Sequence, residues 1–331
     1  MSGSNKTKVA VLDDWQGVAK QSADWSKLQQ KADIVFLEEP FAGSDKLAKA
    51  LGEFDIIIAM RERTKFSKEL LDRLPKLRMI ALTGSRTWTM DIEACNARRI
   101  VISNTGGEKS TAATAEIALG LLLSAARYIP TADASMREGR FQAGVPAGVV
   151  LDGRTLGVMG LGKIGSRLAR YGQALGMKVI AWSQNMTADQ AQAAGARLVD
   201  KATLLAESDA ITLHLVLSDR TRGIVGAADL ARMKPGAILV NTSRGPLVDE
   251  TALVERLRTG KLIAGLDVYA QEPLPPEHPL RSLPNVVMTP HLGYCTQEVY
   301  AQFYRESIEN VMAFLDGKPT RVLNPEALRP A

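Results

Sequence analysis

Residues 155–165 read Thr-Leu-Gly-Val-Met-Gly-Leu-Gly-Lys-Ile-Gly, an apolar run that leads directly into the pattern Gly160-x-Gly162-x-x-Gly165. The run predicts a buried strand, and apolar residues at helical spacing after it predict a helix through Leu175. Gly160 permits a tight turn, Gly162 lets backbone approach a pyrophosphate, and Gly165 lets the helix pack closely on the strand. The N–H groups at the start of such a helix attract phosphate. The stretch therefore predicts a dinucleotide site, and the alternative is a glycine-rich packing turn.

The composition is that of an ordinary globular protein of about two domains. The chain has 331 residues, of which 46% are hydrophobic and 23% charged, and a formal net charge of +5. Basic residues are interspersed with acids, so we expect attraction of anionic ligands and no nucleic-acid surface. Cys95 and Cys295 have no metal-ligand spacing, which predicts no metal site and a reducing, cytoplasmic setting with both cysteines buried. A polar N-terminus and the lack of a long apolar run predict no secretion signal and no membrane span.

Short apolar runs alternate with helical patterns in two series along the chain. In the first series, strands are predicted at 9–12, 34–37, 55–60, 78–83 and 100–103, with helices near 18–31, 44–51, 67–73 and 91–98. In the second series, strands are predicted at 156–160, 179–182, 197–199, 210–215, 238–241, 263–266 and 286–288. Strands separated by helices pair in parallel through right-handed crossovers. The pattern predicts an α/β protein with two Rossmann-like or flavodoxin-like, doubly wound sheets.

Two long helical stretches, predicted at 110–128 and 298–315, mark the joints between the domains. The chain therefore enters the second domain near 104 and leaves it near 296. We predict a discontinuous substrate-binding domain of residues 1–104 and 297–331, a dinucleotide-binding domain of residues 105–296, and a cleft between them. Residues 139–148 and 271–284 are predicted to be loops.

Three blocks of the sequence resemble the D-isomer-specific 2-hydroxyacid dehydrogenases, the family of D-lactate, D-glycerate/glyoxylate and phosphoglycerate dehydrogenases. They are 157–165, then 233–250 with Asn-Thr-Ser-Arg-Gly at its centre, and 265–293, which begins Gly-Leu-Asp-Val-Tyr and ends Thr-Pro-His-Leu-Gly. Their order and spacing agree along essentially the whole chain. The resemblance implies an NAD- or NADP-dependent enzyme that interconverts a small 2-oxo acid and its D-2-hydroxy acid, and a homodimer formed through the cofactor domains.

The resemblance assigns the catalytic roles to Arg244, Glu272 and His291. Reduction of a 2-oxo acid needs a cation for the carboxylate or carbonyl oxygen, and arginine offers an always-charged fork. Histidine titrates near neutral pH, so it can donate a proton in reduction and accept one in oxidation. A neighbouring carboxylate favours the imidazolium and fixes the ring orientation. The alternatives are a solvated turn residue for Arg244 and a surface charge for Glu272.

Other side chains near these blocks have two interpretations each. His278, in Glu-His-Pro, is predicted to be structural or on the surface. His214 ends a buried strand at the edge where ligands bind, and either lines the cofactor site or is a core histidine. Tyr294 and Cys295 depart from the small residues common after His-x-Gly in the family. Tyr294 either shapes the substrate pocket or only packs.

The cofactor contacts are predicted at the carboxyl edge of the second sheet. An acid about 20 residues past the glycines normally binds the ribose hydroxyls of NAD, but Ser183 stands at that position. No arginine follows to bind a 2′-phosphate, so either NAD or NADP is expected, with NADP use plausible. The full predicted set is Gly160, Gly162, Lys163, Ile164, Gly165, Ser183, Gln184, Asn185, His214, Thr242, Ser243, Asp267 and Gly293.

In the first domain, the predicted substrate-binding residues Thr83, Gly84, Ser85 and Arg86 follow the fourth strand. Family members hold the substrate carboxylate with backbone amides of this loop, and Arg244 is predicted to share that role. Two alternatives to this enzyme remain: a non-catalytic, NAD(H)-sensing protein like the corepressors of this fold, and a same-fold dehydrogenase of another substrate class, such as formate. The intact Arg, Glu and His set favours the 2-hydroxyacid enzyme, whose particular substrate the sequence does not identify.

Overall fold

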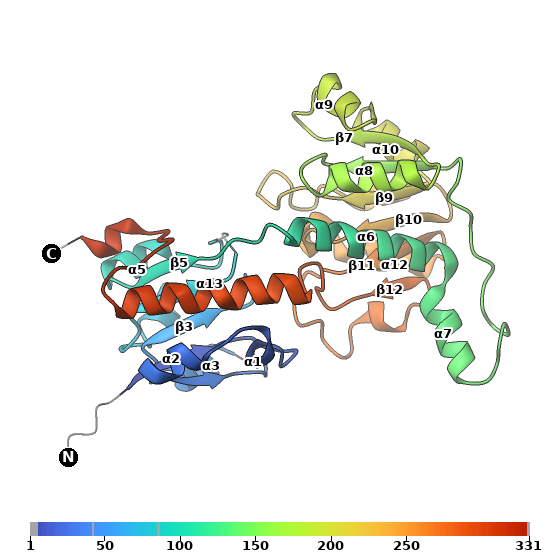
Figure 1. The fold of residues 1–331 in the computed structure, drawn as a ribbon. Helices are drawn as coiled ribbons and strands as arrows, with labels where there is room; N and C mark the ends of the chain where they lie inside the picture. The colour runs from blue at the N-terminus through green and yellow to red at the C-terminus, as the bar shows by residue number, and fades with distance from the viewer. Residues whose placement is uncertain (1–5, 42, 85–86, 330–331) are drawn as a thin grey trace, which may run out of the picture. The chain divides into compact units, whose positions relative to one another are not determined.

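The computed structural model describes residues 6–41, 43–84 and 87–329 (Figure 1). Contacts divide the chain into unit 1, Met1–Lys109 with Thr296–Ala331, and unit 2, Ser110–Cys295. Unit 1 is therefore built from two segments of the chain. The predicted domain boundaries, 104/105 and 296/297, lie within a few residues of the boundaries of the two units. The roles assigned to the two domains stay predictions.

Unit 1 contains a five-stranded parallel sheet with the order β2-β1-β3-β4-β5. The strands are β1 (Thr7–Val11), β2 (Ala32–Phe36), β3 (Ile56–Ala59), β4 (Met79–Leu82) and β5 (Val101–Asn104). Every residue of β3 and β4 is buried, because helices cover both faces of such a sheet. The five predicted strands are confirmed, in the flavodoxin-like order.

The helices of unit 1 come from both of its segments. They are α1 (Ala19–Ser22), α2 (Ser26–Lys31), α3 (Ser44–Leu51), α4 (Lys68–Leu71), α5 (Ile92–Ala97), α13 (Gln297–Leu315) and the short 3-10 helix η3 (Pro325–Leu328). The prediction of one helix at 18–31 is wrong. The chain is extended at Ala23, and the Asp24 carboxylate accepts a hydrogen bond from the backbone N–H of Ser26, so the helix breaks there.

Asn324 fastens the second segment of unit 1 to the first. Its Oδ1 accepts from the Ile102 N–H at 2.7 Å, and its Nδ2 donates to Asn96 Oδ1 and to the Ile100 carbonyl, both at 2.9 Å. Asn324 is buried, and a buried amide is stable only with its hydrogen bonds formed. The returning chain is thus part of the core of unit 1, which explains why that unit is discontinuous.

Unit 2 contains a seven-stranded parallel sheet with the order β12-β11-β10-β9-β6-β7-β8. The strands are β6 (Thr155–Met159), β7 (Lys178–Trp182), β8 (Arg197–Leu198), β9 (Ala210–Leu213), β10 (Ala237–Asn241), β11 (Leu262–Leu266) and β12 (Val286–Met288). All seven match predicted strands. The strand order reverses at β6, which lies between β7 and β9, as in the Rossmann fold. Ligands bind such sheets at the carboxyl ends of the strands beside this reversal.

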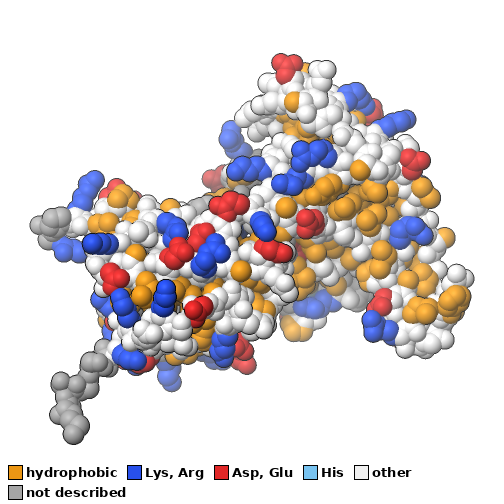
Figure 2. All heavy atoms as spheres, viewed as in Figure 1, with side chains coloured by type: hydrophobic (Ala, Val, Ile, Leu, Met, Phe, Trp, Pro, Cys, Tyr) orange, Lys and Arg blue, Asp and Glu red, His pale blue; other side chains and the backbone are white. Residues whose placement is uncertain are grey.

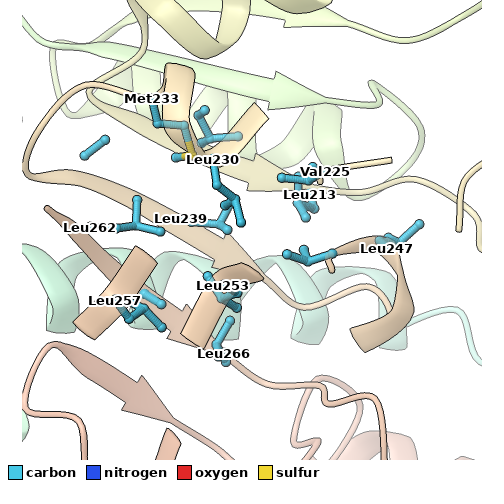
Figure 3. Packing of buried hydrophobic residues seen from close by; sticks show 14 of the residues in the cluster. Leu213, Val225, Leu230, Met233, Leu239, Leu247, Leu253, Leu257, Leu262 and Leu266 are labelled. Carbon is cyan, nitrogen blue, oxygen red and sulfur yellow. The ribbon is translucent and has the colours of Figure 1, made fainter. Parts of the chain in front are cut away.

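Helices cover both faces of the second sheet. They are α6 (Ser110–Arg127), α7 (Ile129–Arg137), α8 (Gly165–Ala174), α9 (Ala188–Ala193), α10 (Lys201–Glu207), α11 (Ala227–Arg232) and α12 (Glu250–Arg258), with the 3-10 helices η1 (Gly245–Leu247) and η2 (Pro279–Ser282). α6 and α8 pack on one face, and α10, α11 and α12 on the other. Figure 3 shows the second of these cores, where Leu230, Leu253 and Leu257 meet side chains from the strands.

Helix α7 was not predicted. Tyr128, at the predicted helix end, has a left-handed backbone with φ 52°, and Pro130 then lies in the first turn of α7. Among the described residues, no single helix is long and apolar enough to span a membrane, although α6 and α7, bent by 66°, pass a test of length and composition together. The predicted loop at 139–148 has no helix or strand, whereas η2 interrupts the one at 271–284.

The glycine turn after β6 is built by close approach of backbone. Gly160 has φ 97°, and a Cβ on it would lie 2.8 Å from the His214 carbonyl oxygen. A Cβ on Gly165 would lie 1.9 Å from the Gly160 carbonyl oxygen, so no side chain fits there. A Cβ on Gly162 would meet nothing within 4 Å. Two of the three glycines are therefore required by packing, while Gly162 leaves space outside the first turn of α8.

Gly165→Ala should destabilise the protein, because its methyl group would force α8 away from the turn, an overpacking cost of about 1–3 kcal/mol. Gly162→Ala is the matched control, and it should leave the free energy of unfolding nearly unchanged while weakening dinucleotide binding. Urea unfolding measures the first effect and NADH fluorescence titration the second. Equal stability of the two variants would contradict this account of the turn.

Candidate active site

The carboxyl edge of the sheet in unit 2 carries most of the predicted site residues. The glycine turn follows β6, and His214 follows β9. Thr242, Ser243 and Arg244 follow β10. Asp267 and Glu272 follow β11, and His291 and Gly293 follow β12. Because parallel strands all end at the same edge, residues far apart in sequence lie near one another here.

His291 and Glu272 form a hydrogen-bonded pair. The distance from His291 Nδ1 to Glu272 Oε2 is 2.6 Å, and Glu272 Oε1 accepts from the Tyr269 N–H at 2.9 Å. Burial raises the pKa of Glu272, but the bond to His291, the N–H of Tyr269 and the nearby charge of Arg244 together hold that pKa below its ordinary value. Glu272 is therefore a carboxylate at neutral pH. It engages Nδ1, so proton exchange with a ligand falls to Nε2.

Asp267 determines the backbone geometry of the turn that carries His291. Its buried carboxylate accepts from Thr289 Oγ1 at 2.6 Å, from the Leu292 N–H at 2.7 Å and from the Gly293 N–H at 2.8 Å. His291 itself has φ 56°, a left-handed conformation that is costly for a residue with a side chain. Asp267 accepts hydrogen bonds from Thr289, before His291, and from Leu292 and Gly293, after it, and these bonds offset that cost. The predicted cofactor contacts of Asp267 and Gly293 stay predictions.

The loop that carries Arg244 is fixed by Asn241, which was not among the predicted site residues. Asn241 Oδ1 accepts from the Ser243 N–H, and its Nδ2 donates to the Arg244 carbonyl, both at 3.0 Å. A Cβ on Gly245 would lie 2.0 Å from the carbonyl carbon of Tyr269, so this loop touches the backbone that leads to Glu272. Unit 2 thus brings Arg244 and Glu272 into one neighbourhood. The signal for Asn241 was its place in the Asn-Thr-Ser-Arg-Gly block.

The rings of the two remaining histidines are each held by hydrogen bonds. His214 Nε2 lies 2.8 Å from Thr212 Oγ1, and burial lowers the pKa of His214 to about 3, so its imidazole is neutral at neutral pH. It lies beside the glycine turn but is not a proton donor of the kind His291 can be. His278 Nε2 lies 3.2 Å from Glu250 Oε1, and its Nδ1 accepts from the Leu280 N–H. His278 ties the 271–284 segment to α12, in agreement with the structural interpretation.

A cavity of about 400 Å³ opens at the carboxyl end of β7. Its lining residues are Trp182, Ser183, Met186, Leu198, Val199 and Asp200. Apolar side chains lie here beside the Ser183 hydroxyl and the Asp200 carboxylate, and this mixture is suited to an adenosine group. Of these lining residues, only Ser183 was among the predicted cofactor contacts. The others come together through the pairing of β7 with β8. Gln184 and Asn185 are exposed, in a turn closed by the bond from the Met186 N–H to the Ser183 carbonyl.

Several features of unit 2 fit a bound dinucleotide. Gly162 leaves open space at the start of α8, next to Lys163, which is exposed. Ile164 directly precedes α8, which begins at Gly165 and ends at Ala174, one residue before the predicted end at Leu175. Thr242 Oγ1 is buried and has no hydrogen-bond partner in the described part of the chain, which leaves it for a ligand. Ser243 Oγ instead donates to the Leu215 carbonyl at 2.6 Å.

The predicted substrate loop of unit 1 is described only in part. Thr83 is buried, and its Oγ1 accepts from the Arg61 N–H at 2.9 Å. The Gly84 N–H donates to Thr105 Oγ1 at 2.8 Å, so that amide is already used within the unit. Ser85 and Arg86 lie outside the described residues. Their predicted contacts with substrate stay predictions.

Comparison with known proteins identifies the family. Residues 119–293 match the family model described as D-isomer specific 2-hydroxyacid dehydrogenase, NAD binding domain. The chain belongs to the D-isomer-specific 2-hydroxyacid dehydrogenase family. It is 39% identical over 291 residues to a glyoxylate reductase from Thermococcus litoralis, covering 85% of this chain and 87% of the relative. It is 37% identical over 289 residues to a D-3-phosphoglycerate dehydrogenase from Archaeoglobus fulgidus, covering 87% of this chain and 54% of the relative.

A solved structure shows the same fold. The crystal structure of a phosphoglycerate oxidoreductase from Vibrio cholerae O395 matches with a TM-score of 0.89 at 36% identity, over 94% of this chain and 99% of that chain. The chain spans about half the length of the phosphoglycerate dehydrogenase from Archaeoglobus and most of the glyoxylate reductase. The predicted family and the two parallel-sheet α/β domains are confirmed. Unit 2 contains the NAD-binding domain of the family.

The low pKa of His214 predicts acid sensitivity. Below about pH 6.5 the unfolded chain protonates this histidine, whereas the folded chain does so only near pH 3. Stability should therefore fall as pH decreases through this window, because the unfolded state binds the extra proton. In His214→Gln, the free energy of unfolding should depend less on pH across this window. Urea unfolding between pH 4 and 7.5 measures it, and parallel profiles for the variant and the wild type would contradict the prediction.

Proposed function

We propose that the protein is an NAD(P)-dependent dehydrogenase that interconverts a small 2-oxo acid and its D-2-hydroxy acid. The observation that carries this proposal is the 2.6 Å bond between His291 Nδ1 and Glu272 Oε2, formed where the charge of Arg244 also acts on Glu272. This arrangement supports proton transfer at a carbonyl oxygen next to a carboxylate. The glyoxylate reductase and phosphoglycerate dehydrogenase names of the relatives support the same substrate class.

The dinucleotide would be held by the glycine turn and the cavity beside β7. The N-terminal N–H groups of α8 and the open side of Gly162 would receive the pyrophosphate, and Ser183 would meet the adenosine ribose. The buried hydroxyl of Thr242 is a further candidate contact. Bound there, the nicotinamide would supply the hydride in reduction and accept it in oxidation.

The residues of the chain supply binding and the proton. Arg244 would bind the substrate carboxylate through its planar fork. In the reductive direction, protonated His291 would donate from Nε2 to the carbonyl oxygen, and in oxidation neutral His291 would take that proton back. Glu272 keeps Nδ1 protonated in both directions and stabilises the imidazolium.

The paired His291 and Glu272 favour this enzyme over a dinucleotide sensor, because a sensor needs the glycine turn but no oriented acid and base. A same-fold dehydrogenase of another class, such as one for formate, has no specific observation in its favour. The cofactor is proposed to be NAD or NADP. Ser183 places no carboxylate at the ribose position, so a 2′-phosphate meets no repulsion from that residue.

We further propose a homodimer in the cytoplasm. Four large apolar side chains that follow α6 are 50–71% exposed, namely Ile129, Met136, Phe141 and Val150. Figure 2 shows apolar side chains gathered over α6 and α7 in this view, and covering such a surface with a second copy would remove it from water. The two cysteines, Cys95 and Cys295, are both free thiols, which supports a reducing compartment. The proposed partners are the small acid and the second copy, with no nucleic acid and no membrane.

His291→Ala should lower kcat by about 10²–10⁴-fold, the usual contribution of a general acid, and should leave dinucleotide affinity nearly intact. The assay follows NADH and NADPH absorbance with a panel of small 2-oxo acids that includes glyoxylate. His278→Ala is the control, because it also removes a bonded histidine but should keep activity. Full activity in His291→Ala would refute the mechanism, and a wild type that binds NADH but reduces no acid would favour the sensor.

Ser183→Asp should shift the cofactor preference toward NAD. The new carboxylate would bond the ribose hydroxyls and repel a 2′-phosphate, changing relative kcat/KM by roughly one or two tenfold steps after screening by ions. The experiment compares NADH with NADPH at saturating 2-oxo acid in wild type and variant. If the wild type already rejects NADPH, other residues of this loop recognise the ribose, and the prediction that the enzyme uses NADP is wrong.

A further inference from the structure

We propose that Tyr294 is a positioning residue for His291, a role that rests on the proposed function of that histidine. The two rings meet edge to face, with centroids 5.8 Å apart and an interplanar angle of 70°. Tyr294 is only 4% exposed, so the ring is held by surrounding atoms as well as by the imidazole. The edge-to-face arrangement is a favoured geometry between aromatic rings.

The backbone beneath Tyr294 is anchored on three sides. The Gly293 N–H donates to Asp267 Oδ2 at 2.8 Å, and the Gly293 carbonyl accepts from Thr114 Oγ1 of α6 at 2.9 Å. The Cys295 N–H donates to the Leu292 carbonyl at 2.9 Å and closes the turn. The Tyr294 ring therefore stands on a rigid turn, and it can serve as a fixed surface for the imidazole.

The bond to Glu272 alone does not fix the orientation of His291. The torsion that rotates an imidazole has a broad energy well, and a carboxylate oxygen accepts hydrogen bonds over a broad range of directions. Both allow the ring to tilt while the Nδ1 bond persists. Contact with the Tyr294 ring limits the tilt of the imidazole, and the contact therefore determines the direction of Nε2. Catalysis is sensitive to a small misplacement of a reacting group.

We assign this role to the aromatic ring of Tyr294, because the ring is the part that meets the imidazole edge to face. Cys295, the other unexpected residue of the turn, is half-buried rather than buried as predicted, and its Sγ lies 3.6 Å from the His291 carbonyl oxygen. That contact is with the backbone of His291. A small side chain at position 294 would remove the ring contact while the Asp267 bonds to the turn remain.

The test compares Tyr294→Phe with Tyr294→Ala. Tyr294→Ala should lower kcat on the order of tenfold, shift the pH profile of kcat, and leave the affinity for NADH unchanged, whereas Tyr294→Phe should stay within about twofold of wild type. Tyr171→Ala is the control for loss of a partly buried tyrosine in α8, away from the imidazole. A kcat and pH profile of Tyr294→Ala equal to wild type would overturn the proposal. So would an equal loss in Tyr294→Phe, or the same loss in Tyr171→Ala.

A second readout separates this proposal from the proposed function. The ¹³C and ¹⁵N relaxation of the His291 ring reports how much the imidazole moves, with or without turnover. The ring should be rigid in wild type and Tyr294→Phe, whereas in Tyr294→Ala it should show additional motion while Nδ1 stays bonded to Glu272. A wild type without turnover would end the proposed function but not the positioning role, and unchanged ring motion in Tyr294→Ala would end the positioning role alone.

Discussion

The buried carboxylate of Asp267 is the interaction on which the site in unit 2 depends. Its three hydrogen bonds hold a turn in which His291 adopts a backbone conformation that it would otherwise avoid. A buried acceptor of this kind stabilises a turn only while its donors remain in place. Residues that follow β11 and residues that follow β12 are thereby tied together, and the imidazole reaches the carboxylate of Glu272 as a result.

Close backbone approach provides the second constraint. Gly165 brings α8 onto the glycine turn, and Gly245 brings the Arg244 loop onto the chain that leads to Glu272. Neither position has room for a Cβ atom. The loops share one edge of the sheet, and these two close contacts set the distances between them. Glycine is required at both positions because it has no side chain.

Much of the fold could be predicted because parallel strands have a strong local signature. Runs such as 56–59 and 79–82 are wholly apolar, and their burial in the structure follows from helices on both faces. The break at Ala23 and the start of α7 after Tyr128 escaped prediction, since both depend on single backbone conformations. The resemblance to the family predicted catalytic roles for Arg244, Glu272 and His291, and the structure pairs His291 with Glu272. The walls of the cavity beside β7 depend on strand pairing, which no local pattern encodes. Asn241 belongs to the Asn-Thr-Ser-Arg-Gly block, but its role became visible only through its side-chain bonds to the Ser243 and Arg244 backbone.

The junction at Asn324 has a consequence for how the protein is made. The five strands of unit 1 are synthesised before unit 2, but α13 and Asn324 leave the ribosome after it. The Ile102 N–H in β5 and the Ile100 carbonyl just before it, which Asn324 binds, must wait for the whole of unit 2 to be translated. Domains generally fold as units during synthesis, so the continuous unit 2 can complete its fold first. The first segment of unit 1, whose five strands wait for α13 and Asn324, is then the part of the nascent chain most dependent on protection from aggregation.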